Sequence, residues 1–148
     1  MATYKSASFD DIDLLVQMMQ DFYAIDGYPI NIDQSKKLFS TFISNENLGK
    51  AWLIESGNQT VGYLILTFIF SFEYGGTIGF VDELYLSGQA RGKGIGKQSI
   101  AFAQSEAAKL SLKLLYLEVE PHNATAQKLY LAAGFSEHKR QLMRFKTK

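Results

Sequence analysis

The hydrophobic pattern at the start of the chain predicts one strand and two amphipathic helices. Residues 3–8 can pair as a short edge strand. Apolar residues then recur three or four positions apart over residues 12–22, with acidic and amide side chains between them, which predicts a helix that buries one face. Gly27 and Pro29 end this helix, and residues 32–43 repeat the same spacing. The first third of the chain should therefore hold a strand and two helices.

The middle of the chain is rich in β-branched and aromatic residues, which favour strands. Residues 51–55 and 61–72 are separated by Ser-Gly-Asn-Gln-Thr, and this arrangement predicts a β-hairpin. A strand over residues 77–86, an alanine-rich helix over residues 96–110 and another strand over residues 113–119 follow. Because strand, helix and strand succeed one another, we expect the two strands to be parallel neighbours joined by a right-handed crossover.

The last part of the chain predicts a helix and two short strands. Asn123 is suited to cap a helix over residues 124–133, and Gly134 is suited to end it. Residues 135–137 and 141–145 are predicted to form short closing strands.

Composition places all of these elements in one domain. With 148 residues, 47% of them hydrophobic, the chain is long enough for one substantial core but short for two. The 15 basic and 15 acidic residues cancel, so no field of one sign attracts nucleic acid or an anionic membrane. We expect a single domain over residues 1–148 that binds neither nucleic acid nor membrane. The sequence leaves the oligomeric state open, a homodimer included.

Residue content also excludes several kinds of site. The absence of cysteine excludes disulfides, thiolate metal sites and a cysteine nucleophile, and two histidines are too few for a histidine zinc cluster. We therefore expect no metal. The N-terminus lacks a basic segment followed by an apolar one, and no apolar run approaches the ~20 residues of a membrane span. The expected location is cytoplasmic.

Two neighbouring acids, Asp82 and Glu83, interrupt the otherwise apolar strand of residues 77–86. Burying an unpaired charge costs several kcal/mol, so each carboxylate must reach solvent, a partner or a cleft. Side chains alternate along a regular strand, and only one of the two acids can then face a given cleft. A β-bulge would change this alternation.

A glycine-rich segment over residues 89–96 joins this strand to the following helix. Its three glycines are Gly92, Gly94 and Gly96. Glycine adopts positive φ and lets the backbone approach a ligand closely, and the first turn of the helix directs free N–H groups into the loop. Arg91 and Lys93 add positive charge. The segment therefore predicts a phosphate-binding loop, with a plain glycine-rich turn as the alternative.

Two common phosphate loops do not match this spacing. A Walker loop requires Ser or Thr after Gly-Lys, whereas Gly96 and Lys97 are followed by Gln98. A dinucleotide fingerprint G-x-G-x-x-G that starts at Gly94 ends on Ser99. The glycine spacing therefore matches that of a dinucleotide-binding domain only in part.

Two motifs in the second half match a different family. The first is Leu84-Tyr85-Leu86 followed by Arg91-x-x-Gly94-x-Gly96, and the second is Leu117-x-Val119-x-x-x-Asn123-x-x-Ala126-x-x-Leu129-Tyr130-x-x-x-Gly134-Phe135. Together they resemble the signatures of the GNAT superfamily of N-acetyltransferases. The resemblance implies an α/β (α+β) fold with about four helices and a mixed, mostly antiparallel sheet of six to seven strands. The sheet would splay between its fourth and fifth strands, where acetyl-CoA binds.

The resemblance also implies which residues hold acetyl-CoA. The backbone of Leu84 and Leu86 would pair with the pantetheine arm, and Asn123 would contact the same arm. The pyrophosphate would lie on the loop made of Arg91, Gly92, Lys93, Gly94, Ile95 and Gly96. Tyr130 would contact the cofactor and protonate the leaving thiolate.

The implied reaction is transfer of the acetyl group to a primary amine by direct attack on the thioester. Positioning carries much of the rate, but the amine must also lose a proton. Asp82 and Glu83 are the candidate bases, with Glu118, Glu120 or a water chain as alternatives. Tyr23 and Tyr28 complete a candidate substrate site for a small cationic or aromatic amine. Two alternatives stay open: a protein lysine or N-terminus as acceptor, and a non-catalytic acyl-CoA sensor with the same fold.

Overall fold

The computed structural model describes residues 1–148, which divide into two compact units, Met1–Glu118 and Val119–Lys148. The expected single domain over residues 1–148 stays a prediction. The first unit contains every strand. Its elements are β1 (Thr3–Ser6), a 3₁₀ turn (Phe9–Asp11), α1 (Ile12–Ile25), α2 (Ile32–Ile43), β2 (Gly49–Ser56), β3 (Gln59–Ser71), β4 (Gly76–Leu86), a second 3₁₀ turn (Gly88–Ala90), α3 (Ile95–Lys109) and β5 (Leu115–Leu117).

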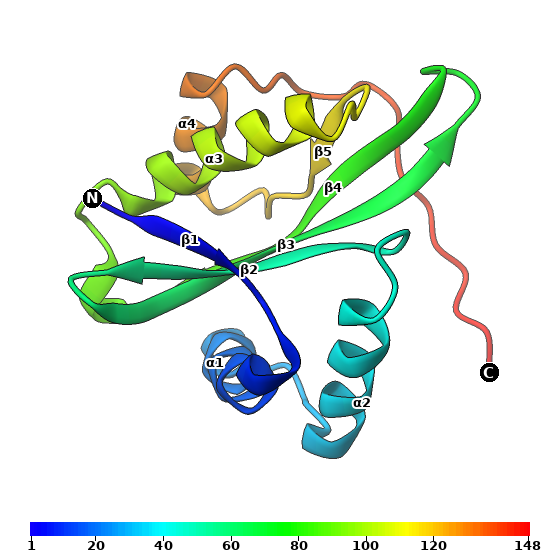
Figure 1. The fold of residues 1–148 in the computed structure, drawn as a ribbon. Helices are drawn as coiled ribbons and strands as arrows, with labels where there is room; N and C mark the ends of the chain where they lie inside the picture. Colours follow the sequence, from blue (N-terminus) through cyan, green and yellow to red (C-terminus); the bar gives the residue numbers. More distant parts are fainter. The chain divides into compact units, whose positions relative to one another are not determined.

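The five strands form one mixed sheet in the order β1-β2-β3-β4-β5 (Figure 1). The first four strands are antiparallel neighbours, and β5 is parallel to β4, as the strand-helix-strand order predicted. The β4–β5 ladder covers only Gly79 to Val81, so the two strands separate beyond that point. The expected mixed sheet that splays between its fourth and fifth strands is confirmed.

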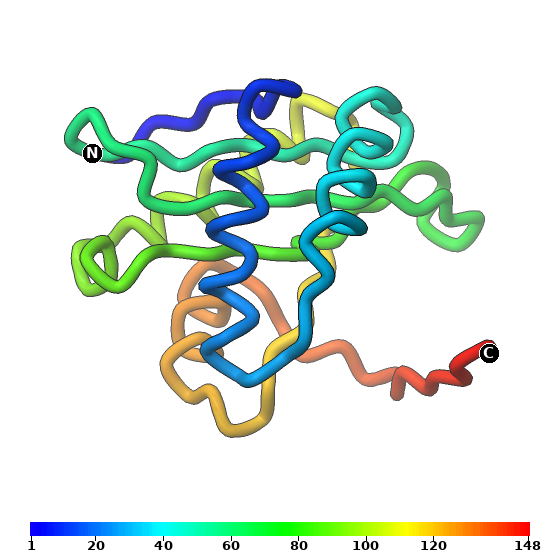
Figure 2. Tube along the Cα trace, turned by 90° about the horizontal axis from the view of Figure 1, so that it is seen from below, coloured from blue at the N-terminus to red at the C-terminus, as the bar shows by residue number.

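Helices cover both faces of the sheet in the first unit. Figure 2 shows α1 and α2 side by side across the same face of the strands. There, Leu15 of α1 and Phe39 of α2 share a core with Tyr63 of β3. On the opposite face, Ala103 of α3 packs in a core with Leu64 of β3. The alternation of Tyr63 and Leu64 between the two cores is the period-two pattern expected of a strand buried on both faces.

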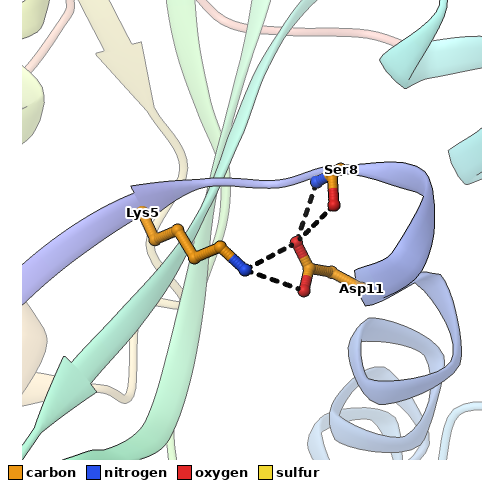
Figure 3. A network of polar contacts seen from close by, with 3 residues as sticks. All are labelled: Lys5, Ser8 and Asp11. Carbon is orange, nitrogen blue, oxygen red and sulfur yellow. Dashed lines mark hydrogen bonds and ion pairs between the residues drawn. The ribbon is translucent and has the colours of Figure 1, made fainter.

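A polar network holds β1 to the start of α1 (Figure 3). Asp11 accepts hydrogen bonds from the Ser8 backbone N–H at 2.8 Å and from the Lys5 ammonium at 3.2 Å. Burial of the Asp11 carboxyl opposes ionisation, but the hydrogen bonds from Ser8 and Lys5 outweigh it and lower the pKa of Asp11. The network therefore fixes the point at which the chain enters α1.

The second unit contains one helix, α4 (Ala124–Ala132), which makes four helices in all, as expected. The predicted closing strands at residues 135–137 and 141–145 are wrong, because neither segment is a strand, and the sheet has five strands rather than six or seven. Leu142, Met143 and Phe145 are all exposed. Without buried apolar area, nothing offsets the entropy that is lost when such a segment is ordered as a strand. No helix in either unit has the length and apolar character needed to cross a membrane.

Candidate active site

A β-bulge in β4 brings both acids of the predicted pair to one cleft. Ile65 of β3 pairs with Glu83 and the next residue, Leu66, pairs with Val81, so Asp82 is an extra residue in β4. The bulge interrupts the alternation of side chains that a regular strand would impose. Asp82 and Glu83 consequently line the same cleft.

This cleft has a volume of about 480 Å³ and lies between α1, α2 and the β3–β4 part of the sheet. Its walls are mainly apolar, and its only charged lining residues are the two acids. Side chains that line it include Met19, Tyr23, Leu38, Phe39, Phe42, Leu48 and Ile65. The volume is within the usual range for sites that bind small molecules.

The carboxylate of Glu83 accepts hydrogen bonds from two tyrosine hydroxyls that belong to different elements of the fold. Tyr23 of α1 donates a hydrogen bond to Glu83 Oε2, and Tyr63 of β3 donates one to Glu83 Oε1, both at 2.6 Å. The Tyr63 side chain is 0% exposed, so this hydroxyl has no access to solvent. Both carboxylate oxygens therefore have a donor, and the orientation of the group is set by rigid elements rather than by a loop.

The environment shifts the pKa of every member of this cluster. Burial raises the pKa of Glu83, and the nearby charge of Asp82 raises it further, while the hydrogen bonds from Tyr23 and Tyr63 counteract part of the effect. Partial burial and the charge of Glu118 raise the pKa of Asp82. Burial and the Glu83 carboxylate raise the pKa of both tyrosines, so they remain protonated donors. The cleft thus holds one clamped carboxylate beside a more exposed one.

The other residues predicted to contact the substrate are placed differently. Tyr23 lines the cleft, whereas Tyr28 is 58% exposed and is not among the lining residues. Phe70 and Phe72 are exposed near the end of β3 and do not line the cleft. The predicted role of Tyr28 stays a prediction.

Two of the three glycines in the loop have the positive φ that the sequence predicts, whereas Gly96 lies in the first turn of α3. Gly92 and Gly94 have φ of +76° and +79°, in the left-handed region that favours glycine. Gly94 is the N-cap of α3 and supplies no side-chain hydrogen bond, so the first-turn N–H groups of α3 are not capped by a side chain. No atom lies within 4 Å of the position where a Cβ on either glycine would be, so the backbone is open to a ligand.

The charged residues of the loop are oriented toward solvent. Arg91 Nε donates a 3.1 Å hydrogen bond to the carbonyl of Leu86, which fixes the base of the guanidinium and leaves its outer nitrogens for other partners. Arg91 and Lys93 are both exposed, whereas Ile95 is buried in the core and anchors the start of α3. The loop therefore presents exposed positive charge next to its positive-φ glycines.

Beyond Val81, the edge of β4 that faces β5 has no strand partner. Leu84 pairs with Leu64 and Leu86 pairs with Gly62, both on the β3 side. On the other side the ladder with β5 has already ended. Backbone groups at such an edge can pair with an extended amide-containing ligand.

Two predicted site residues belong to the second unit. Asn123 caps α4, because its side-chain oxygen accepts a 3.1 Å hydrogen bond from the N–H of Ala126. The Tyr130 ring lies 6.0 Å, centroid to centroid, from that of Phe135, and burial raises the pKa of Tyr130. Their predicted roles toward acetyl-CoA stay predictions.

Sequence reasoning missed Tyr63 and the contribution of α2. A buried tyrosine hydroxyl usually has a hydrogen-bond partner, so Tyr63 within an apolar strand was a signal that a polar group lies nearby. Its partner could be identified only from the pairing of β3 with β4. The wall formed by Leu38, Phe39 and Phe42 had no signal beyond ordinary helical amphipathicity. The structure contains no group of three or more His, Cys, Asp or Glu side chains that could hold a metal ion.

Comparison with known proteins gives matches over both parts of the chain. An "uncharacterized N-acetyltransferase YycN" of Bacillus subtilis (strain 168) is 40% identical over 58 residues, which are 39% of this chain and 37% of that protein's length. The integron cassette protein HFX_CASS3, from the mobile metagenome of Cole Harbour Salt Marsh, is 32% identical with a TM-score of 0.88, over 98% of this chain and 90% of that chain. A structure titled as a predicted acetyltransferase with acetyl-CoA from Clostridium acetobutylicum has a TM-score of 0.81 at 22% identity, over 98% of this chain and 96% of that chain, and shows the shared fold.

The profile of the acetyltransferase (GNAT) family matches residues 15–135. That range contains the two acids, the glycine loop and α4. The resemblance drawn from the two sequence motifs is thereby confirmed, and the chain belongs to the acetyltransferase (GNAT) family.

Proposed function

We propose that this protein transfers the acetyl group of acetyl-CoA to the nitrogen of a primary amine that binds in the cleft between α1, α2 and the sheet. One observation carries the proposal. The two carboxylates that line the cleft, Asp82 and Glu83, lie at the start of the segment of β4 that has no partner on the β5 side. An amine held by these acids would lie beside the strand edge on which the family resemblance places the thioester.

The residues of the first unit fit acetyl-CoA. Family membership supports acetyl-CoA as the co-substrate. The uncapped first turn of α3 and the outer nitrogens of Arg91, together with Lys93, would bind the pyrophosphate. The free edge of β4 at Leu84 and Leu86 would pair with the pantetheine amides. When bound, acetyl-CoA supplies an activated thioester that an amine can attack directly.

Asp82 and Glu83 would have different roles toward the amine. A primary amine is mostly protonated at pH 7 and must lose a proton before it attacks. Glu83, held by two hydroxyls, is oriented to accept that proton. Asp82, which is more exposed, would attract the ammonium group. Tyr130 would protonate the leaving thiolate, the role that its place in the family motif implies.

A thiol-release assay with acetyl-CoA and a panel of primary amines tests this function. Glu83→Gln should lower kcat by about 100-fold or more, the scale of a lost general base, whereas Asp82→Asn should mainly raise the KM of the amine. Calorimetry should show that both variants keep their affinity for acetyl-CoA. If the wild type binds acetyl-CoA but acetylates no amine of the panel, the protein is an acyl-CoA sensor rather than an enzyme.

A further inference from the structure

We infer that the cleft selects a monoamine in which a short spacer joins the ammonium group to an aromatic body, in preference to polyamines and amino acids. The inference rests on the proposed function, because it names the class of amine that the same cleft takes. Three features of the cleft carry it: where its charge lies, what its walls are made of, and which charges it lacks.

The negative charge of the cleft is confined to one place. Among all the residues that line it, only Asp82 and Glu83 are ionisable carboxylates, and they are adjacent in β4. Glu83 is further occupied by the hydroxyls of Tyr23 and Tyr63. One ammonium group therefore finds a partner here. A second ammonium several ångströms along a polyamine would find no second carboxylate. It would meet apolar side chains or the neutral polar groups of the lining, which compensate lost hydration of a charge less than a carboxylate does; these polar residues are Asn31, Gln34, Ser35, Thr41 and Thr67.

The remaining walls suit an aromatic ring. Phe39 and Phe42 of α2 line the cleft on one side, and Met19 of α1 and Ile65 of β3 line it on others. Aromatic and methionine side chains make favourable contacts with an aromatic ligand in addition to the area that they bury. Leu38, which is 60% exposed, also lines the cleft and marks its opening to solvent. A ring on a short spacer would fill the apolar space while its ammonium reaches the acids.

The cleft also lacks any positive charge. No lysine, arginine or histidine is among the lining residues. The α-carboxylate of an amino acid would find no cationic partner and would be repelled by Asp82 and Glu83. Phenethylamine and phenylalanine share a ring and a spacer and differ in that carboxylate. Comparing the two as acceptors therefore isolates the effect of that carboxylate on acetyl transfer.

The test compares phenethylamine, phenylalanine and spermidine as acceptors for acetyl transfer by the full chain. We expect kcat/KM for phenethylamine to exceed that for each of the other two by at least about tenfold. Leu38→Asp should narrow the gap between spermidine and phenethylamine, because it adds a negative charge to the wall away from β4. Leu131→Asp is the matched control, because Leu131 is a 62% exposed leucine of α4 that does not line the cleft. It should leave the preference unchanged.

The outcomes separate this inference from the proposed function. Efficient acetylation of spermidine or phenylalanine, with phenethylamine poor, overturns the inference and leaves the N-acetyltransferase function standing. If no amine is acetylated, the function fails, and calorimetric binding of the same three compounds decides the inference. Preferential binding of phenethylamine that Glu83→Gln weakens supports it, and equal or absent binding of the three refutes it.

Discussion

Replacing Tyr63 with Phe should shift the acid limb of the pH profile of acetyl transfer to higher pH without unfolding the protein. Tyr63 donates a 2.6 Å hydrogen bond to Glu83 Oε1 from a fully buried position. The substitution removes one hydroxyl and no carbon, so the ring keeps its contacts with Phe22 and Tyr85. Glu83 loses one of two phenolic donors, and Tyr23 retains the other.

The size of the effect follows from the charge on the acceptor. A hydrogen bond to an ionised group contributes about 1.5–3 kcal/mol, which corresponds to about a tenfold to hundredfold change in proton affinity. Burial and Asp82 raise the pKa of Glu83, and the hydrogen bonds from Tyr23 and Tyr63 lower it. Removing a lowering contribution raises the pKa further. Because only the ionised carboxylate accepts a proton, the acid limb of kcat/KM should move to higher pH.

The measurement is kcat/KM for the amine at saturating acetyl-CoA, from about pH 5 to 9. Infrared absorption of isotopically labelled glutamate reports the same titration without turnover. Tyr4→Phe is the matched control, because the Tyr4 hydroxyl lies 3.1 Å from Ser99 Oγ and Tyr4 packs against the core on the α3 face. It removes a phenolic hydrogen bond elsewhere in the same unit and should leave the acid limb in place.

Two results would refute this reasoning. One is an unchanged acid limb and an unchanged infrared titration in a folded Tyr63→Phe protein, which would mean that the clamp does not control the ionisation of Glu83. The other is an equal displacement in Tyr4→Phe, which would attribute the change to general loss of stability rather than to the hydrogen bond.

Three further predictions concern the cofactor loop, the second unit and the fold. Gly94→Val should abolish acetyl-CoA binding measured by calorimetry, because a β-branched residue is strained at φ of +79° and its side chain would cover the loop; unchanged affinity in a folded variant contradicts the site. Tyr130→Phe should keep acetyl-CoA affinity within severalfold and lower turnover about 100-fold, and full turnover would remove Tyr130 from catalysis. Asp11→Asn should lower stability by about 1–2 kcal/mol at pH 7. Since the folded pKa of Asp11 is lowered, this difference should persist above the unfolded pKa of about 3.9 and vanish as pH falls through the folded pKa; thermal melts in which the gap does not narrow contradict it.

Local patterns in the sequence were sufficient for most of the elements. The helical spacing over residues 12–22 predicted α1, and the succession of strand, helix and strand predicted the parallel pairing of β4 with β5. Such features depend on neighbours three or four positions away, or on the φ that glycine alone adopts readily. The closing strands at residues 135–137 and 141–145 were predicted wrongly, because strand formation depends on a partner that local propensity does not supply.

The sequence by itself determined the family of this protein, the glycine loop before α3 and the presence of an acidic pair in β4. Only the tertiary structure decided how that pair is used. The bulge at Asp82 is set by the register in which β3 pairs with β4. The hydrogen bonds to Glu83 of β4 come from Tyr23 of α1 and Tyr63 of β3, which are distant from it in sequence. Both depend on non-local packing. A shift of one residue in register would turn these side chains to the other face of the sheet.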